Sequence, residues 1–295
     1  MECNVGAGRA LPLRAGKARP SETVCHIIFL LCAIVSILCV ILICIFLFAN
    51  ALPAFRKIGL VQFLLGRDWS PSDTPPAFGI LPMILGSVYV TIGALVVGVP
   101  IGILCAVFLV KTCPKKLYRI VKPGIDLLAG IPSVVYGFFG MAAIVPLFGN
   151  SILSASILLG IMILPTVIGL SESAVRAVNE QYYEGALALG AGHYRAVFCV
   201  VLPAAKSGVL AAIVLGLGRA IGETMAVIMV AGNQARMPLS LLKGVRTMTA
   251  NIVIEMGYAT GLHREALIAT GVVLFVFILI INVSFSVLKR GNNHD

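Results

Sequence analysis

The sequence predicts an all-α membrane protein, a polytopic bundle of six transmembrane helices. Of its 295 residues, 59% are hydrophobic and only 12% are charged, and the mean hydropathy of +1.04 is typical of a chain built from membrane spans. The apolar residues gather in runs that can cross a bilayer core of about 30 Å at a rise of about 1.5 Å per residue. The formal charge of +10 then reflects basic loops on one side of a membrane rather than nucleic-acid binding.

Six apolar runs are predicted to span the membrane: residues 27–49, 83–110, 127–148, 152–170, 207–232 and 266–288. The first run resembles a signal peptide, because basic residues precede it and Ala49-Asn50-Ala51 ends it. Its apolar core of 23 residues is longer than the usual signal-peptide core of about 7–15 residues. We therefore expect residues 1–26 to form a cytoplasmic tail, residues 27–49 a retained helix, and residues 83–288 the membrane core.

Basic residues are unequally divided between the two sets of loops. The N-terminal tail, the loops after the second and fourth runs and the C-terminus hold 14 of the 22 basic residues, whereas the other loops hold seven. The positive-inside rule then places both termini in the cytoplasm, as an even number of spans requires. The basic residues of the tail are Arg9, Arg14, Lys17 and Arg19.

The fifth run is the only one that carries charged side chains. Arg219 and Glu223 are four residues apart, so a continuous helix would place them on one face. An arginine at mid-membrane depth costs at least about 2.5–3.5 kcal/mol and usually marks a substrate pathway. The alternative is an ion pair within the helix that only neutralises itself.

The third run contains Pro132, which should kink a helix and free a carbonyl group. Ser133 and Tyr136 follow it on the same run. We interpret this segment as a kinked helix that lines the substrate path, with a simple packing kink as the alternative.

Residues 171–206 form a long loop of helix-forming composition, predicted to lie in the cytoplasm. Gly190 and Gly192 should divide it into two short helices, the first with Glu184 and Ala188 on one face. Residues 194, 198 and 201 should share a face of the second helix. Such a pair of helices suits docking into a groove of a partner, although a loop lying on the lipid surface is the alternative.

The same loop carries a recognisable motif. Glu184-Gly185-Ala186, then Gly190, then the sequence from Val200 to Pro203 resembles the EAA loop of ABC importer permeases, with Gly185 in place of alanine and Val200 in place of isoleucine. In that family the loop forms the coupling helix that inserts into the ATP-binding subunit. The resemblance assigns ATPase coupling to Glu184, Gly185, Ala186, Gly190 and Pro203.

Three further segments resemble permeases of phosphate importers: residues 129–138, 218–226 and 249–267. Together the similarity extends from about residue 80 to the C-terminus. Thr224-Met225-Ala226 and the loop from Trp69 to Pro76 resemble the PstC type rather than the PstA type.

The resemblance implies a multi-pass permease in the bacterial cytoplasmic (inner) membrane that imports inorganic phosphate. Its partners would be a second permease of the PstA type, two ATP-binding subunits and an external phosphate-binding protein. ATP and Mg would bind to the partner ATPase, and the chain itself shows no P-loop, nucleophilic triad or Cys/His ligand cluster. We therefore expect no enzyme activity, cofactor or metal site in this polypeptide.

The expected substrate path consists of Arg219, Glu223, Ser133 and Tyr136. The planar guanidinium of Arg219 suits bidentate binding of phosphate. Glu223 could accept the proton of a phosphate and repel fully deprotonated sulfate, or it could only neutralise Arg219. A permease for another oxyanion is the nearest alternative function. An ion-coupled carrier or channel is a different class, which the lack of an inverted repeat and the EAA-like loop disfavour.

Overall fold

The computed structural model describes residues 20–291, so the predicted basic tail residues Arg9, Arg14, Lys17 and Arg19 lie outside the described residues. The chain divides into two compact units, residues 1–46 and 47–295. In the first unit the described residues form the beginning of α1 (Pro20–Ile58), which continues into the second unit. This helix is longer than the predicted 27–49. It continues past Pro53 and ends before Gly59, which has φ +85°.

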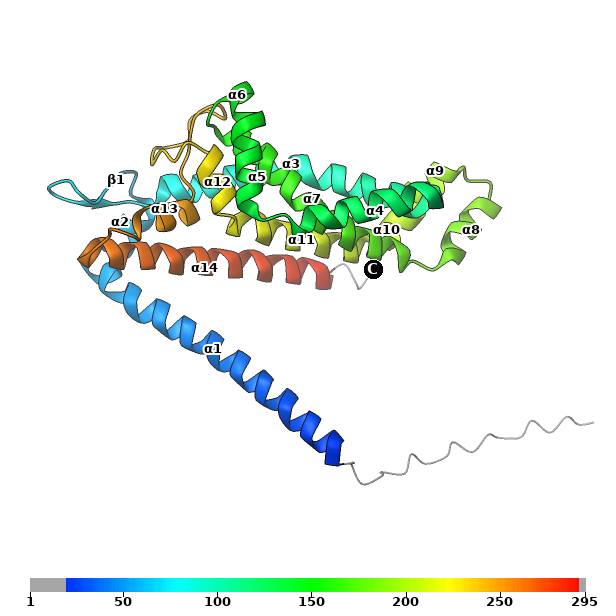
Figure 1. Cartoon of the computed structure of the whole chain (residues 1–295), viewed down its shortest axis with the longest axis horizontal. Helices are drawn as coiled ribbons and strands as arrows, with labels where there is room; N and C mark the ends of the chain where they lie inside the picture. The colour runs from blue at the N-terminus through cyan, green and yellow to red at the C-terminus, as the bar shows by residue number, and fades with distance from the viewer. Residues whose placement is uncertain (1–19, 292–295) are drawn as a thin grey trace, which may run out of the picture. The chain divides into compact units, whose positions relative to one another are not determined.

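Four long helices lie side by side in the second unit (Figure 1): α3 (Leu81–Lys111), α7 (Ile152–Arg176), α11 (Lys206–Gly222) and α14 (Gly261–Gly291). Glycines let the first two approach closely. A Cβ atom added to Gly98 of α3 would lie 2.7 Å from the carbonyl oxygen of Gly160 on α7. Small residues at such seams allow membrane helices to pack through van der Waals contact.

Two of the predicted spans are broken. The third consists of α4 (Lys115–Gly130) followed by α5 (Ser133–Phe139), η1 (Gly140–Ile144) and α6 (Val145–Phe148), with a bend of 101° between the two parts. The kink predicted at Pro132 is therefore present, but it is a full break between two helices rather than a bend within one helix over residues 127–148. Pro132 explains the break, since the residue before a proline is pushed out of the helical region, and Ile131 has φ −70° and ψ 128°.

The fifth span is bent at its start and interrupted near its end. It comprises α9 (His193–Ala196), η2 (Val197–Val201), α10 (Leu202–Ala204) and α11, with a bend of 71° before α11. The helix ends at Gly222, and α12 (Met225–Val230) begins after two non-helical residues. The prediction of one helix over 207–232 is thus also wrong.

Within residues 20–291, four helices are long and apolar enough to cross a membrane: α1, α3, α7 and α14. The number rises to six if each of the two bent pairs counts as one span. The all-helical class of the prediction is confirmed, together with the resemblance of the bundle to ABC importer permeases reported below. A two-stranded hairpin, β1 (Trp69–Ser70) and β2 (Ala77–Phe78), adds a small element that the sequence did not predict.

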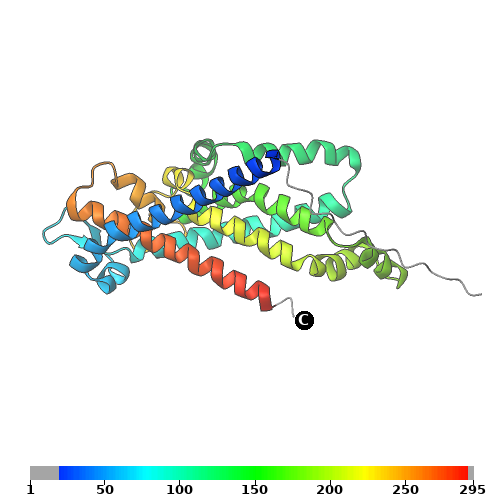
Figure 2. The ribbon, with the colours of Figure 1, turned by 90° about the horizontal axis from the view of Figure 1, so that it is seen from below.

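Different elements form the two ends of the second unit. The hairpin, α2 (Leu60–Leu65) and α13 (Met248–Glu255) lie at one end, and α8 (Glu180–Ala188) and α9 lie at the other, as Figures 1 and 2 show. We call these the hairpin end and the α8 end. A buried cluster at the hairpin end includes Phe63, Trp69, Phe78 and Met248.

The contact between α3 and α7 gives a stability prediction. Gly98→Ala should destabilise the protein by about 1–3 kcal/mol, because the added methyl group would meet the backbone oxygen of Gly160 at 2.7 Å and the side chain of Ile163 at 2.8 Å. Gly169→Ala on α7 is the matched control, since a Cβ atom there would have nothing within 4 Å. Thermal denaturation of the two variants in detergent measures the difference, and equal melting temperatures would contradict the packing argument.

Candidate functional site

The break after α11 places Glu223 outside the helix. Glu223 has an extended backbone, with φ −70° and ψ 132°, and its carboxylate Oε1 accepts a hydrogen bond of 3.2 Å from the backbone N–H of Ala226. The carboxylate therefore caps the first turn of α12. The carbonyl oxygen of Glu223 accepts a hydrogen bond of 3.1 Å from the hydroxyl of Thr249 in α13. Both ends of the break are thereby held in place.

Arg219 lies in the last turn of α11 and is half-buried. Its Nη1 atom donates a hydrogen bond of 3.2 Å to the hydroxyl of Thr166 on α7. The expectation that Arg219 and Glu223 share one helix face is wrong, because the helix ends before Glu223. Among the ion pairs within residues 20–291, none joins the two side chains. Their separate partners do not support the self-neutralising alternative.

The break in the third span is bridged by Tyr136. This side chain is buried, and its hydroxyl donates a hydrogen bond of 2.8 Å to the carbonyl oxygen of Leu128 in α4. In a continuous helix that carbonyl would accept from residue 132, but a proline has no N–H to donate. Tyr136 is therefore a second donor to this carbonyl, which also accepts a bond of 3.3 Å from the N–H of Ile131 in place of the donor that Pro132 lacks. Ser133 begins α5 and is half-buried.

The two breaks belong to one region, because α5 packs against α12. A Cβ atom on Gly137 would lie 3.3 Å from the Cα atom of Ala226, so a larger residue there would push the two segments apart. Tyr136 and Ala226 belong to the same buried cluster. The structure thus packs the segment that contains Tyr136 against the segment that follows the break at Glu223.

The segment expected to form two short helices does so. Gly190 has φ +86°, a left-handed conformation that glycine adopts at little cost. The N–H of Ala191 donates to the carbonyl of Ala186 at 3.0 Å, and the N–H of Gly190 donates to that of Leu187 at 2.9 Å. These are the two bonds of a Schellman motif, which ends α8. Glu184 and Gly185 are exposed on α8, whereas Ala186 is buried.

The predicted shared face of the second short helix is wrong. Tyr194 and Phe198 are 67% and 41% exposed, but Val201 is fully buried. Residues 197–201 form a π-helical turn, which carries more residues per turn than an α-helix. This turn moves Val201 away from the face that an α-helical count assigns to it.

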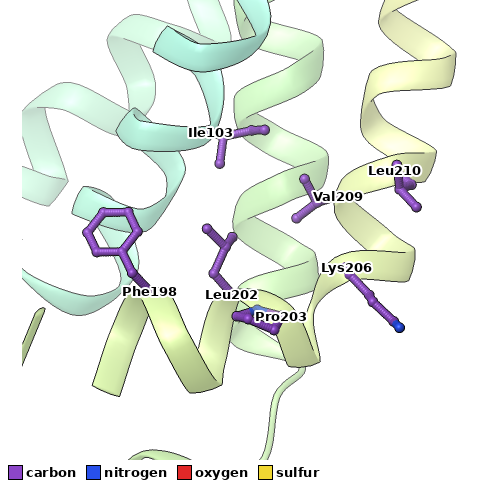
Figure 3. Close-up of a pocket in the computed structure, with 7 residues that line it drawn as sticks. All are labelled: Ile103, Phe198, Leu202, Pro203, Lys206, Val209 and Leu210. Atoms are coloured by element: carbon purple, nitrogen blue, oxygen red, sulfur yellow. The ribbon is translucent and has the colours of Figure 1, made fainter. Parts of the chain in front are cut away.

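Pro203 lies apart from α8. It is in α10 and lines an apolar pocket of about 320 Å³, whose other walls come from Ile103 of α3, from η2 and from α11 (Figure 3). Lys206 is the one charged residue that lines the pocket. The residues of the EAA-like motif therefore form two groups in space, one on α8 and its terminal turn and one on α10.

A buried polar cluster at the hairpin end escaped the sequence analysis. Glu255 is only 6% exposed, and its carboxylate accepts hydrogen bonds from Nε1 of Trp69 at 2.8 Å and from Nη1 of Arg246 at 2.6 Å. Nε2 of His263 lies 2.8 Å from the same carboxylate. In the sequence, the available signal was a lone glutamate within the mainly apolar segment 248–256. Its proximity to Trp69 and His263 is visible only in the structure. Within residues 20–291, no group of three His, Cys, Asp or Glu is arranged to hold a metal ion.

Comparison with known proteins defines the class to which this chain belongs. Residues 98–293 match the family described as the binding-protein-dependent transport system inner membrane component, and the chain belongs to this family. It is an inner-membrane permease subunit of a binding-protein-dependent ABC importer, a class in which partner subunits carry the ATPase activity. This membership excludes the carrier or channel alternative.

Individual relatives are more specific. The chain is 38% identical over 266 residues to a probable ABC transporter permease protein, YqgH, of Bacillus subtilis (strain 168), covering 85% of this chain and 86% of that protein. It is 34% identical over 255 residues to the phosphate transport system permease protein PstC of Xylella fastidiosa (strain 9a5c), covering 77% and 76%.

The fold resembles solved importer structures. The MetNI methionine ABC transporter in an inward-facing conformation matches with a TM-score of 0.56 and 20% identity, over 72% of this chain and 94% of the other. At this identity the match supports the fold alone.

Proposed function

We propose that this chain is the PstC-type permease subunit of a phosphate importer. It would act with a second permease of the PstA type, two ATP-binding subunits and an external phosphate-binding protein. The observation that carries the proposal is the half-buried guanidinium of Arg219, which lies in the last turn before the break at Glu223 and whose hydrogen bond is to the neutral hydroxyl of Thr166. The relatives named PstC, at 32–34% identity, support phosphate as the substrate.

The partners of Arg219 favour an anion. The guanidinium has five N–H donors, and Thr166, its recorded hydrogen-bond partner in the described residues, is a neutral hydroxyl that accepts from one nitrogen. The positive charge is therefore not neutralised by direct contact with a carboxylate. A planar fork with remaining donors suits a tetrahedral oxyanion. We assign Arg219 to phosphate binding and Tyr136 and Ser133 to the wall of the path.

Glu223 has a defined position in this proposal. One of its carboxylate oxygens caps α12, while its negative charge stays near the break. That charge would repel an anion that carries no proton and tolerate one that does. The carboxylate would then contribute to discrimination between phosphate and sulfate.

The α8 end is assigned to the ATP-binding subunit and to the cytoplasmic side of the membrane. Glu184 and Gly185 are exposed there, and the Schellman turn at Gly190 fixes the angle between α8 and α9. Ala186 supports α8 from its buried face, and Pro203 supports the start of the following span. The chain termini would lie on the same side as this loop.

Topology is tested by labelling single cysteines introduced into a cysteine-free chain. A membrane-impermeant maleimide should label Lys243→Cys at the hairpin end in intact cells, because that end is external in this proposal. Lys116→Cys, at the start of α4, should react only after the membrane is permeabilised. The opposite pattern would reverse the orientation.

Coupling is tested at Gly190. Gly190→Val should abolish phosphate uptake while the protein still inserts into the membrane, because a β-branched residue is strained at φ +86°. Gly124→Val on α4 is the control, since φ there is not positive and a Cβ atom has nothing within 4 Å. Uptake by cells and recovery of the ATPase with the permease are the measurements. Normal uptake by the Gly190 variant would remove the coupling assignment.

Substrate binding is tested at Arg219. Arg219→Ala should lower phosphate uptake by the reconstituted complex about tenfold to a hundredfold, since a charge-assisted hydrogen bond contributes about 1.5–3 kcal/mol. Arg219→Lys should also be impaired, because an ammonium lacks the planar fork. Arg119→Ala, which removes an exposed charge from α4, is the control. Unchanged phosphate uptake by Arg219→Ala would refute the site, and uptake of another oxyanion in preference to phosphate would change the substrate.

The role of Glu223 is separated from its capping bond by one substitution. The side-chain carbonyl of Gln can still accept from the N–H of Ala226, so Glu223→Gln keeps the cap and removes the charge. We expect sulfate to compete better with phosphate for uptake in this variant. Unaltered competition would leave the carboxylate with its capping role alone.

A further inference from the structure

The last residue of α3 makes contacts that the EAA-like motif does not include. The ammonium of Lys111 lies 3.0 Å and 2.8 Å from the two carboxylate oxygens of Glu180, at the start of α8. The same ammonium lies 4.6 Å from the centre of the Tyr183 ring, one turn further along α8. Although it is at the end of a helix, the Lys111 side chain is only 10% exposed. Its charge is therefore committed to α8.

The second short helix is joined to the same point. The hydroxyl of Tyr183 lies 2.7 Å from Nδ1 of His193 in α9, and the two rings meet edge to face with centres 5.8 Å apart. Thr112, the residue after α3, lies 3.5 Å from Nε2 of His193. Lys111, Tyr183 and His193 thus connect α8 and α9 to the end of α3.

Apolar packing of α8 is limited. Ala186 is its only buried residue, and the partly buried Tyr183 packs against a small apolar cluster that includes Val175 and Val201. A polar pocket of about 490 Å³ lies between α8 and the ends of α3 and α7, lined by residues that include Lys111, Arg176 and Glu180. The polar contacts of Lys111 therefore add to a small apolar contact in orienting α8.

We propose that Lys111, Glu180, Tyr183 and His193 form a clamp that transmits movement of the coupling loop to α3. The inference rests on the proposed function, because it takes α8 as the part moved by the ATP-binding subunit. The four residues touch no substrate and act as positioning residues. The Glu180 side chain is 60% exposed, so the pair adds little to stability. The contacts of one ammonium with both carboxylate oxygens and with the Tyr183 ring nevertheless define the position of α8 relative to the end of α3.

The far end of α3 meets the substrate region. Ser87, near the start of α3, accepts a hydrogen bond of 3.0 Å from the backbone N–H of Met248 in α13. The next residue, Thr249, donates to the carbonyl of Glu223 at the break before α12. Movement received at Lys111 therefore has a continuous set of contacts, through α3 and α13, to the break that holds Glu223.

A charge exchange tests the clamp in the complete complex, reconstituted in lipid vesicles with its partners and the loaded phosphate-binding protein. The measurement is phosphate taken up per ATP hydrolysed. Lys111→Met, Lys111→Glu and Glu180→Lys should each lower this ratio about fivefold or more, the lower end of usual coupling effects, while ATP hydrolysis continues. The double variant Lys111→Glu/Glu180→Lys should recover most of the ratio. Lys115→Met, which removes an exposed charge four residues away, should leave it unchanged.

Each outcome decides the proposal. An unchanged ratio in the three single variants would overturn it, and so would single losses that the double variant does not restore. Should the charge variants fail to assemble, Tyr183→Phe decides. This variant keeps both charges and the aromatic ring but loses the hydrogen bond between the Tyr183 hydroxyl and His193. The ratio should therefore fall, and a wild-type ratio would overturn the clamp.

The outcome is distinguishable from failure of the proposed function itself. If Gly190→Val is fully coupled, the docking role of α8 is wrong and the clamp has nothing to transmit. If Gly190→Val is uncoupled while the Lys111 and Tyr183 variants couple normally, the docking role stands and the clamp alone is removed.

Discussion

The structure depends on one constraint: backbone N–H and C=O groups freed within an apolar bundle need partners from the protein. Each helix break meets this need with a side chain. Glu223 accepts from the N–H of Ala226, Thr249 donates to the carbonyl of Glu223, and Tyr136 donates to the carbonyl of Leu128. The polar residues of the apolar spans are therefore explained first by the breaks that they stabilise. Arg219 lies in the last turn before one of these breaks, and no ion pair within residues 20–291 joins it to a carboxylate.

This constraint also links the break before α12 to the hairpin end. α13 carries Thr249 near its beginning and Glu255 at its end. Through Glu255 the helix is tied to Trp69 of the hairpin, to Arg246 and to His263 of α14. A short helix that is hydrogen-bonded at both ends can hold the break before α12 at a fixed position relative to the hairpin end. A buried carboxylate with three polar partners is costly to disturb, which favours a rigid hairpin end.

The α8 end is built differently. Its helices are short and largely exposed, and they are fixed by a Schellman turn at Gly190 and by the contacts of Lys111 with Glu180 and Tyr183. A segment held by a few polar contacts can change its orientation at lower cost than one held by a packed core. The two ends therefore differ in how easily their segments can be reoriented.

The class of protein, the approximate position of the apolar runs and the turn at Gly190 could be predicted from the sequence, because they depend on local composition and on the conformational freedom of one residue. The sequence also located Arg219, Glu223 and Tyr136 as unusual residues, and the EAA-like motif indicated the family that the comparisons establish.

The positions at which helices end within the apolar runs could be seen only in the tertiary structure. Arg219 and Glu223 fall on different segments because Thr249 and Ala226 supply partners at a break that hydropathy cannot detect. A π-helical turn buries Val201, and contacts between residues far apart in the chain create the Glu255 cluster and the Lys111 clamp. Apolar character adds up residue by residue along the chain, whereas the continuity of a helix depends on whether distant groups can satisfy its backbone.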